Sequence, residues 1–175
     1  MARIEIELNP VTHITTDAIG KPGQRVFYLQ GRQEDKVVTL LVEKIQVQTM
    51  AIGIEQFLSE LNSRYPDLAP ASADYEEDRM RIDIPVDPLF RVGELGLAYD
   101  SEHDLACLIA HEILGENQSD EDAGEVRFWC TRSQLKAISV WSSEVASRGR
   151  AICPQCGEPI DPEEHFCPKK NGHKH

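Results

Sequence analysis

The chain has 175 residues, of which 30 are Asp or Glu and 18 are Lys or Arg, and its formal net charge is −12 at pH 7. Hydrophobic residues make up 41% of the sequence, which is enough to form a core and excludes a disordered polyacid. The longest apolar runs are far below the ~18 residues that a membrane span needs, and the first residues lack the apolar segment of a signal peptide, so we expect a cytoplasmic protein that does not interact with membranes.

The first half of the chain combines strand-like runs with one helix. Residues 3–9 alternate apolar and charged side chains, which is typical of a half-buried strand. The runs at 25–30 and 37–43 flank a polar turn and predict a hairpin. Apolar residues then recur at helical spacing over 45–64 and end before Pro66, which cannot continue a helix. We expect a helix here, with its apolar face packed on the sheet.

The second half repeats this order after an exposed, acidic connection at 65–79. Strand-like runs occur at 90–99, 104–113 and 126–129. The segment 131–147 begins with Thr-Arg-Ser-Gln, which fits a capping box, and its apolar residues again have helical spacing. We therefore expect a second helix over this segment.

These patterns predict an α+β domain over residues 1–149, followed by a zinc-binding tail at 150–175. The domain has two strands-then-helix halves, about 1–65 and 79–149, whose strands form an antiparallel sheet covered by both helices. The strands and helices do not alternate along the chain, so a mainly parallel sheet is not expected. The tail is expected to form a small zinc-ribbon-like knuckle.

Three of the five cysteines lie in the tail and predict a metal site. Cys153 and Cys156 belong to a Cys-Pro-x-Cys-Gly turn that directs two sulfurs to one point, as in a zinc knuckle, and Cys167 follows. In a cytoplasmic chain such a cluster favours a metal over disulfides. Two histidines compete as the fourth ligand: His165 projects to the same side as Cys167 in extended backbone, whereas His173 lies among the terminal residues, where fraying is common. We expect Cys153, Cys156, His165 and Cys167 to close a tetrahedral, structural zinc site that leaves no position for a substrate.

The segment 21–25 combines two basic residues, Lys21 and Arg25, with a forced turn, and these two residues are the predicted binding loop. No set of nucleophile, base and orienting group is apparent, so we assign no catalytic residues. His111 begins a metalloprotease-like pattern, but position 115, where the second histidine would stand, is a glycine. Residues 12–16, which are rich in threonine, are expected to form a polar loop.

These features favour a non-catalytic binding or adaptor protein that recognises another protein or a small-molecule ligand, with structural zinc as its cofactor; they leave its oligomeric state open. The acidic domain would repel phosphate backbones, so nucleic-acid binding is not expected. Two alternatives stay open. In the first, an enzyme site is assembled from separated residues, namely His13, Lys21, Arg25 and His111, with the acidic loops. In the second, a sheet face binds single-stranded nucleic acid through stacking on Phe27, Tyr28 or Trp129.

Five segments of the sequence carry a resemblance to a known family. They are residues 20–30, 41–47, 90–93, 97–100 and 153–172. Together they resemble an uncharacterised bacterial family catalogued as domain of unknown function 3090, and the likeness extends over most of the chain. In that family the residue after Asn-Gly is commonly aromatic, so the resemblance implies His165 as the zinc ligand in place of His173. The resemblance implies no activity.

Overall fold

The computed structural model describes residues 3–21, 23–148, 151–152 and 159–160. Its helices are α1 (Lys44–Arg64) and α2 (Arg132–Arg148), and its 3-10 turns are η1 (Glu77–Met80) and η2 (Asp120–Asp122). The strands are β1 (Glu5–Leu8), β2 (His13–Ile19), β3 (Val26–Gln33), β4 (Lys36–Val42), β5 (Val92–Asp100), β6 (Leu105–Glu112), β7 (Glu125–Cys130), β8 (Ala151–Ile152) and β9 (Pro159–Ile160). No helix in the described part of the chain is long and apolar enough to cross a membrane.

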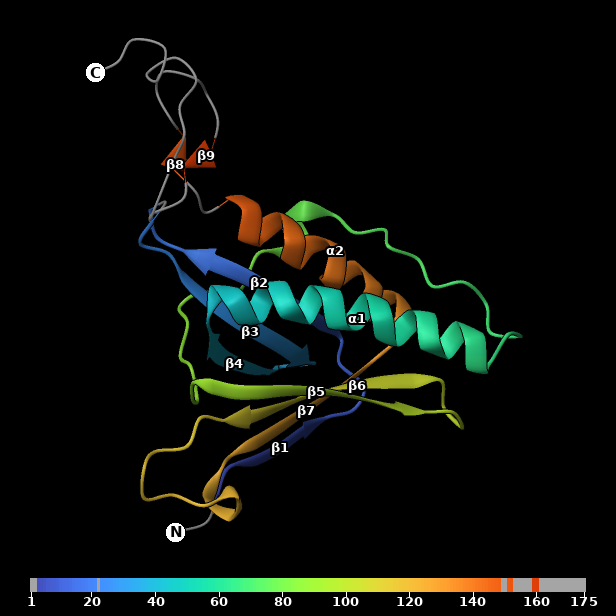
Figure 1. The fold of residues 1–175 in the computed structure, drawn as a ribbon, viewed down its shortest axis with the longest axis horizontal. Coiled ribbons are helices and arrows are strands. Elements are labelled where there is room, and N and C mark those ends of the chain that lie inside the picture. The colour runs from blue at the N-terminus through green and yellow to red at the C-terminus, as the bar shows by residue number, and fades with distance from the viewer. Residues whose placement is uncertain (1–2, 22, 149–150, 153–158, 161–175) are drawn as a thin grey trace.

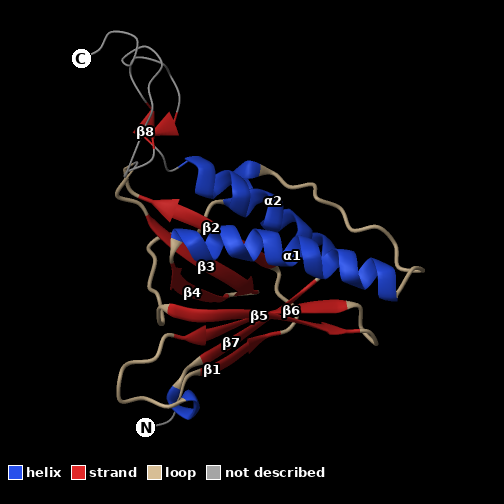
Figure 2. Ribbon diagram, viewed as in Figure 1, coloured by secondary structure: helices blue, strands red, loops and turns tan. Residues whose placement is uncertain are grey.

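Two sheets and two helices form the body of the protein (Figure 1). The larger sheet has the strand order β1-β7-β6-β5, and the smaller sheet, β2-β3-β4, is antiparallel throughout. Figures 1 and 2 show α1 and α2 side by side against the smaller sheet, with the larger sheet below them. The expected α+β class, with strands before each helix, is therefore confirmed.

Both predicted helices lie where the apolar spacing placed them, at Lys44–Arg64 and Arg132–Arg148. The capping box before α2 is also confirmed. The Thr131 N–H donates to Gln134 Oε1 at 2.9 Å, and the Gln134 N–H donates to Thr131 Oγ1 at 3.0 Å. These two bonds satisfy backbone donors that a helix start leaves free, which fixes where α2 begins.

One strand pair differs from the expected antiparallel arrangement. β1 pairs with β7 in parallel, with Ile6 opposite Val126, so the larger sheet combines strands from both halves of the chain. An alternating pattern predicts which face of a strand is buried, but it carries no information on the direction of the partner strand. The direction of β1 therefore could not be predicted from its sequence.

β2 lies where we expected a polar loop at 12–16, and that expectation is wrong. The side chains of Ile14 and Thr16 face the core, whereas Thr15 and Asp17 lie on the opposite face of the smaller sheet, and all four residues are buried. Because both faces are covered and three of these residues are polar, β2 lacks the apolar–polar alternation of a half-buried strand.

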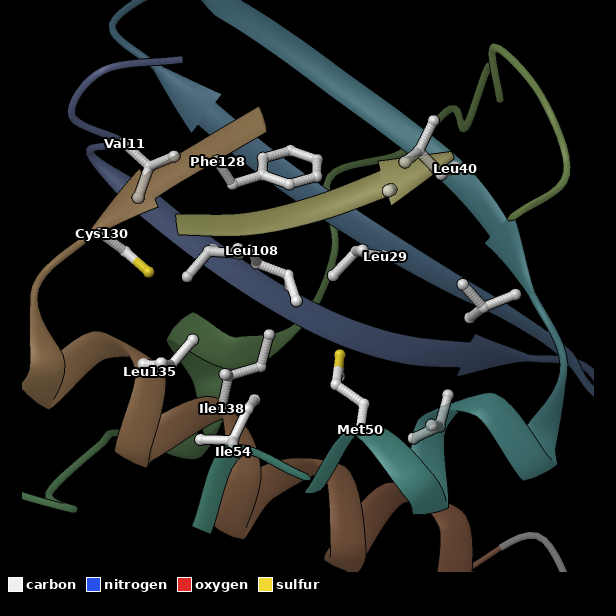
Figure 3. Packing of buried hydrophobic residues seen from close by; sticks show 14 of the residues in the cluster. Val11, Leu29, Leu40, Met50, Ile54, Leu108, Phe128, Cys130, Leu135 and Ile138 are labelled. Atoms are coloured by element: carbon white, nitrogen blue, oxygen red, sulfur yellow. The ribbon is translucent and has the colours of Figure 1, made fainter. Parts of the chain in front are cut away.

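One hydrophobic core connects both sheets and both helices (Figure 3). Fully buried members from each layer are Leu29, Leu40, Ile54, Leu108, Phe128, Leu135 and Ile138. Where β3 meets β7, the smaller sheet has Gly31, and a Cβ at this position would lie 2.4 Å from Cδ1 of Phe128. The packing of the two sheets therefore requires glycine at this point.

The connection between α1 and β5, residues 65–91, contains no strand and crosses the outer face of the smaller sheet. Thr15 Oγ1 donates to the carbonyl of Met80 at 2.6 Å, and Asp17 Oδ2 accepts from the Ile82 N–H at 3.2 Å. These two side chains bond to backbone groups of the connection, which would otherwise need partners in a neighbouring strand.

The next part of the connection is held by a buried amide on β3. Gln30 Oε1 accepts from the Asp83 N–H at 2.8 Å, and Gln30 Nε2 donates to Thr39 Oγ1 at 2.9 Å. Thr39 and Gln30 lie opposite one another in the β3–β4 register, so they share this outer face. The buried polar side chains of the smaller sheet are therefore explained by the connection that covers them.

Candidate functional site

The predicted zinc ligands Cys153, Cys156, His165 and Cys167 lie outside the described residues, as does His173, and the zinc site stays a prediction. The short strands next to the first two cysteines are described. β8 pairs antiparallel with β9, with Ile152 opposite Pro159. The two ends of the segment that contains Cys153 and Cys156 are therefore adjacent.

A cavity of about 430 Å³ lies between β2, the α1–β5 connection and the first turns of α2. Its apolar lining comes from Ile14, Tyr75, Met80 and Ala137, and its polar lining comes from His13, Asp74, Glu76, Arg79, Ser133 and Gln134. The cavity is broadly open to solvent, and its mixed lining and volume fall within the range of sites for small organic ligands, roughly 300–1,000 Å³.

His13 is the titratable group set into the wall of this cavity. Its Nε2 atom is buried and has no hydrogen-bond partner in the described part of the chain. Burial lowers the pKa of His13 below its ordinary value of 6.5, and the backbone carbonyl of Arg79 opposes this shift only in part. The imidazole is therefore neutral at pH 7, and it carries one donor and one acceptor nitrogen.

The apolar wall of the cavity is fixed by the core. The ring of Tyr75 packs edge-on against Trp141, with 5.6 Å between ring centroids. Trp141 is fully buried, and its Nε1 donates to the carbonyl of Thr16 at 2.6 Å. Met80, which lines the cavity with Tyr75, is held through the hydrogen bond between its carbonyl and Thr15. Tyr75 and Met80 thus belong to the α1–β5 connection, but they are positioned by β2 and α2.

The entrance to the cavity is charged and exposed. Arg79 Nε lies 3.1 Å from Glu76 Oε2, and both side chains are more than 70% exposed, so this ion pair contributes little to stability. At the other side, Ser133 Oγ accepts from the Ser72 N–H at 2.9 Å, which ties the connection to the first turn of α2. With Asp74 the entrance has two carboxylates and one guanidinium.

The predicted binding loop, Lys21 and Arg25, lies at the opposite end of β2 from His13. It forms a turn in which the Gln24 N–H donates to the Lys21 carbonyl at 2.8 Å. Lys21 is exposed, whereas Arg25 is half-buried and donates from Nη2 to the carbonyl of Val145 at 2.6 Å. The turn is therefore confirmed, and its role in binding stays a prediction.

Comparison with known proteins identifies the family of this chain. Residues 6–167 match the model of a family described as protein of unknown function (DUF3090). The chain belongs to the DUF3090 family. No curated protein and no solved structure matches it. The matched range includes the positions of Cys153, Cys156, His165 and Cys167, and the family description names no activity.

The residues required by the enzyme alternative are dispersed in this DUF3090 protein. His13 lines the cavity described above, whereas His111 lies on β6 and lines a different cavity of about 480 Å³. His111 Nε2 lies 2.9 Å from Glu125 Oε1, on the outer face of the larger sheet. Lys21 and Arg25 flank the ends of β2 and β3 that lie away from His13. The structure therefore separates these four residues, although His13 lines its cavity with Asp74 and Glu76, and His111 lines its cavity with Asp120.

The aromatic residues of the nucleic-acid alternative do not share a surface either. Phe27 belongs to the core and is 7% exposed. Tyr28 and Trp129 lie in different sheets, and Trp129 Nε1 donates to Glu7 Oε2 at 3.2 Å. A row of bases therefore has no common stacking platform on these three residues in this DUF3090 protein.

The two cysteines of the body are structural. Cys107 and Cys130 are free and fully buried, and burial raises the pKa of each thiol to about 12. Thiols with such pKa values are protonated at neutral pH and do not act as metal ligands or nucleophiles. Both side chains therefore behave as small buried apolar residues.

Sequence reasoning missed the walls of the His13 cavity. Tyr75 and Met80 lie in a stretch whose prolines and acidic residues predicted an exposed connection, and His13 lies in the strand that was expected to be a loop. One signal was available. The connection at 65–91 is longer than the roughly 12–15 residues beyond which segments without regular structure are usually functional or disordered.

Proposed function

We propose that this chain is a cytoplasmic, non-catalytic, zinc-containing binding protein that holds a small organic ligand in the cavity beside His13. The observation that carries this proposal is the α1–β5 connection. It is fixed on β2 by Thr15 and on α2 by Ser133, and the space that it leaves is lined by Tyr75, Met80 and a neutral histidine. A connection fixed at both ends in this way holds the shape of the open cavity beside it.

The lining indicates the chemistry of the ligand. Ile14, Tyr75, Met80 and Ala137 offer apolar contacts, so the ligand has an apolar body. The buried Nε2 of His13 without a partner is costly, and a ligand group that bonded to it after a small turn of the ring toward the cavity would remove this cost. We expect an uncharged or weakly polar ligand with one hydrogen-bonding group directed at His13.

The zinc part of the proposal rests on the cysteine spacing. Three thiolates and one imidazole are a typical ligand set for structural zinc. The pairing of Ile152 with Pro159 is the arrangement expected if Cys153 and Cys156 approach one metal ion from a tight turn. Zinc bound by four protein ligands would order the tail and leave the binding function to the body.

The cavity is tested by screening small fragments with amide chemical shifts of the isotope-labelled, full-length protein. We expect apolar fragments with one polar group to shift the amides of His13, Tyr75 and Ala137. The variant Ala137→Leu fills the cavity and should abolish these shifts. Gly53→Leu is the control, because it introduces the same leucine side chain in a different groove, between α1 and β5, where a Cβ meets nothing within 4 Å.

Two results would contradict the proposed site. One is the absence of any fragment whose shifts centre on His13. The other is equal loss of binding in Ala137→Leu and Gly53→Leu, which would mean that the fragments bind non-specifically. Circular dichroism of both variants would first establish that each is folded.

A further inference from the structure

Three arginine side chains gather near the C-terminal end of α2, in a protein whose formal net charge is −12. The guanidinium carbons of Arg81 and Arg148 lie 5.6 Å and 5.2 Å from the ring centroid of Trp141. Arg25 reaches the same end of the helix through its bond to the Val145 carbonyl. These cations come from the β2–β3 turn, the α1–β5 connection and α2, so the fold creates the cluster.

Arg25 differs from the other two in its partners. Arg148 Nη2 bonds to Glu77 Oε1 at 2.6 Å, and Arg81 Nη1 lies 3.2 Å from Asp17 Oδ1. Arg25 forms no ion pair with any carboxylate of the described residues. Its Nη2 donates to a backbone carbonyl, its Nε is buried without a partner, and its Nη1 forms no hydrogen bond to the described residues.

The surroundings of Arg25 destabilise its charged form relative to an arginine in water. Burial lowers its pKa, the charge of Asp17 opposes this shift, and the smaller effects of Arg148 and Arg81 lower the pKa further. The guanidinium also lies over the ring of Phe27, 4.9 Å from its centroid. A guanidinium that is partly removed from water and faces like charges is stabilised when an anion binds beside it. Within the described part of the chain, the next cation in sequence is the exposed Lys21, in the same turn.

We infer that Arg25 and Lys21 form a binding site for the phosphate group of a phosphomonoester; Arg81 and Arg148 lie nearby but are already paired with Asp17, Glu77 and Glu144. The flat guanidinium and the flexible ammonium both bind phosphate oxygens, and a dianion matches these two cations better than a single carboxylate does. A nucleic acid is a poorer match, because the net charge of −12 repels a long polyanion but leaves one phosphate group free to bind locally.

This site is separate from the cavity beside His13. Ile19, at the end of β2, pairs with Val26 next to Arg25, whereas His13 is the first residue of the same strand. The phosphate site therefore goes beyond the proposed function, and failure at one site leaves the other unaffected.

Titration of the full-length protein with glycerol phosphate and with inorganic phosphate, at constant ionic strength, tests the inference. Amide and arginine Nε–H signals would report binding. We expect saturable shifts around Lys21 and Arg25, with glycerol phosphate binding at least as tightly as inorganic phosphate. The affinity should fall several-fold between pH 7.5 and pH 5, because the phosphate loses its second charge near pH 6.

Substitutions distinguish binding at a specific site from non-specific attraction to positive charge. Arg25→Gln should weaken binding about tenfold and Lys21→Gln several-fold. Arg79→Gln, which removes the same charge from an exposed arginine of the α1–β5 connection, should leave the affinity unchanged. If Arg25→Gln does not fold, Arg25→Lys keeps the charge and should still weaken binding, because it loses the planar donor group.

Three results would overturn the inference. The first is the absence of saturable shifts at millimolar phosphate. The second is equal weakening by Arg79→Gln and Arg25→Gln. The third is tighter binding of a single-stranded oligonucleotide than of glycerol phosphate, with the same dependence on Arg25, which would assign the site to nucleic acid.

Discussion

Thr15 Oγ1 donates to the backbone carbonyl of Met80 at 2.6 Å, and this bond joins residues that are 65 positions apart. Thr15 is fully buried on the outer face of the smaller sheet. Together with the bonds of Asp17, Gln30 and Ser133, this bond fixes where the α1–β5 connection lies, and with it the wall of the cavity beside His13.

Replacing Thr15 by valine keeps the size of the side chain and removes the donor. The carbonyl of Met80 would then be buried without its partner, which costs about 1–3 kcal/mol. We expect the free energy of unfolding to fall by this amount in urea titrations, with faster amide exchange at Ile82. Thr49→Val is the control, since Thr49 is exposed on α1 and bonds only to carbonyls of its own helix. Equal loss in both variants would mean that the Thr15 bond is unimportant.

Two glycines give opposite predictions for the same substitution. A Cβ at Gly31 would lie 2.4 Å from Phe128 in the core, so Gly31→Ala should destabilise the protein by about 1–3 kcal/mol. Gly53 lies inside α1, and a Cβ there meets nothing within 4 Å, so Gly53→Ala should stabilise it by about 1 kcal/mol. Thermal unfolding of both variants tests the packing of the two sheets. A Gly31→Ala variant as stable as the wild type would show that β3 and β7 do not approach as described.

The half-buried imidazole of His13 predicts a pH dependence of stability. Because the folded-state pKa is lowered from 6.5, the unfolded chain takes up a proton first as the pH falls. The contribution of His13 is therefore constant above about pH 6.5 and becomes progressively unfavourable below it, until the folded-state pKa is passed. His13→Gln should remove this part of the pH dependence.

The titration of the His13 ring is measured directly by NMR between pH 7.5 and pH 4.5. We expect its midpoint below 6.5, and we expect urea unfolding of the wild type to lose more stability over this range than unfolding of His13→Gln. A midpoint at or above 6.5 would contradict the burial of His13 in the cavity wall.

Much of the secondary structure could be predicted from the sequence, because it follows local patterns. The apolar stripe of α1 and the capping box at Thr131 each depend on a few neighbouring residues, and both predictions agree with the structure. β2 could not be predicted in this way. Thr15 and Asp17 are buried by a segment that follows more than 60 residues later, and no local pattern shows that they are covered.

The candidate site was less predictable than the fold for the same reason. Its walls come from β2, the α1–β5 connection and α2, and Tyr75 stands in a stretch whose composition is that of an exposed loop. The cysteine motif of the tail is different, because the spacing of zinc ligands is a local pattern. It can therefore be proposed from the sequence without the body of the protein.

The predicted zinc ligands in the tail should differ in how strongly their substitution weakens zinc binding. We expect one zinc ion per chain by elemental analysis, and its loss in single Ala variants of Cys153, Cys156 and Cys167. His165→Ala should weaken binding strongly and His173→Ala only slightly. A chelator should affect the tail and leave the urea unfolding of the body unchanged, because the described part of the chain forms its own core between Leu8 and Ala146. If His173→Ala is the damaging variant, the ligand assignment is wrong.

X-ray absorption at the zinc edge of the full-length protein tests the central claim, a binding protein whose metal is structural, most directly. We expect three sulfur ligands at about 2.3 Å and one nitrogen ligand at about 2.0–2.1 Å, with no water bound to the zinc. His165→Ala should change the nitrogen shell, and His173→Ala should not. A spectrum with an oxygen ligand from water in the wild type would contradict the account, because an open position would make the zinc available for catalysis.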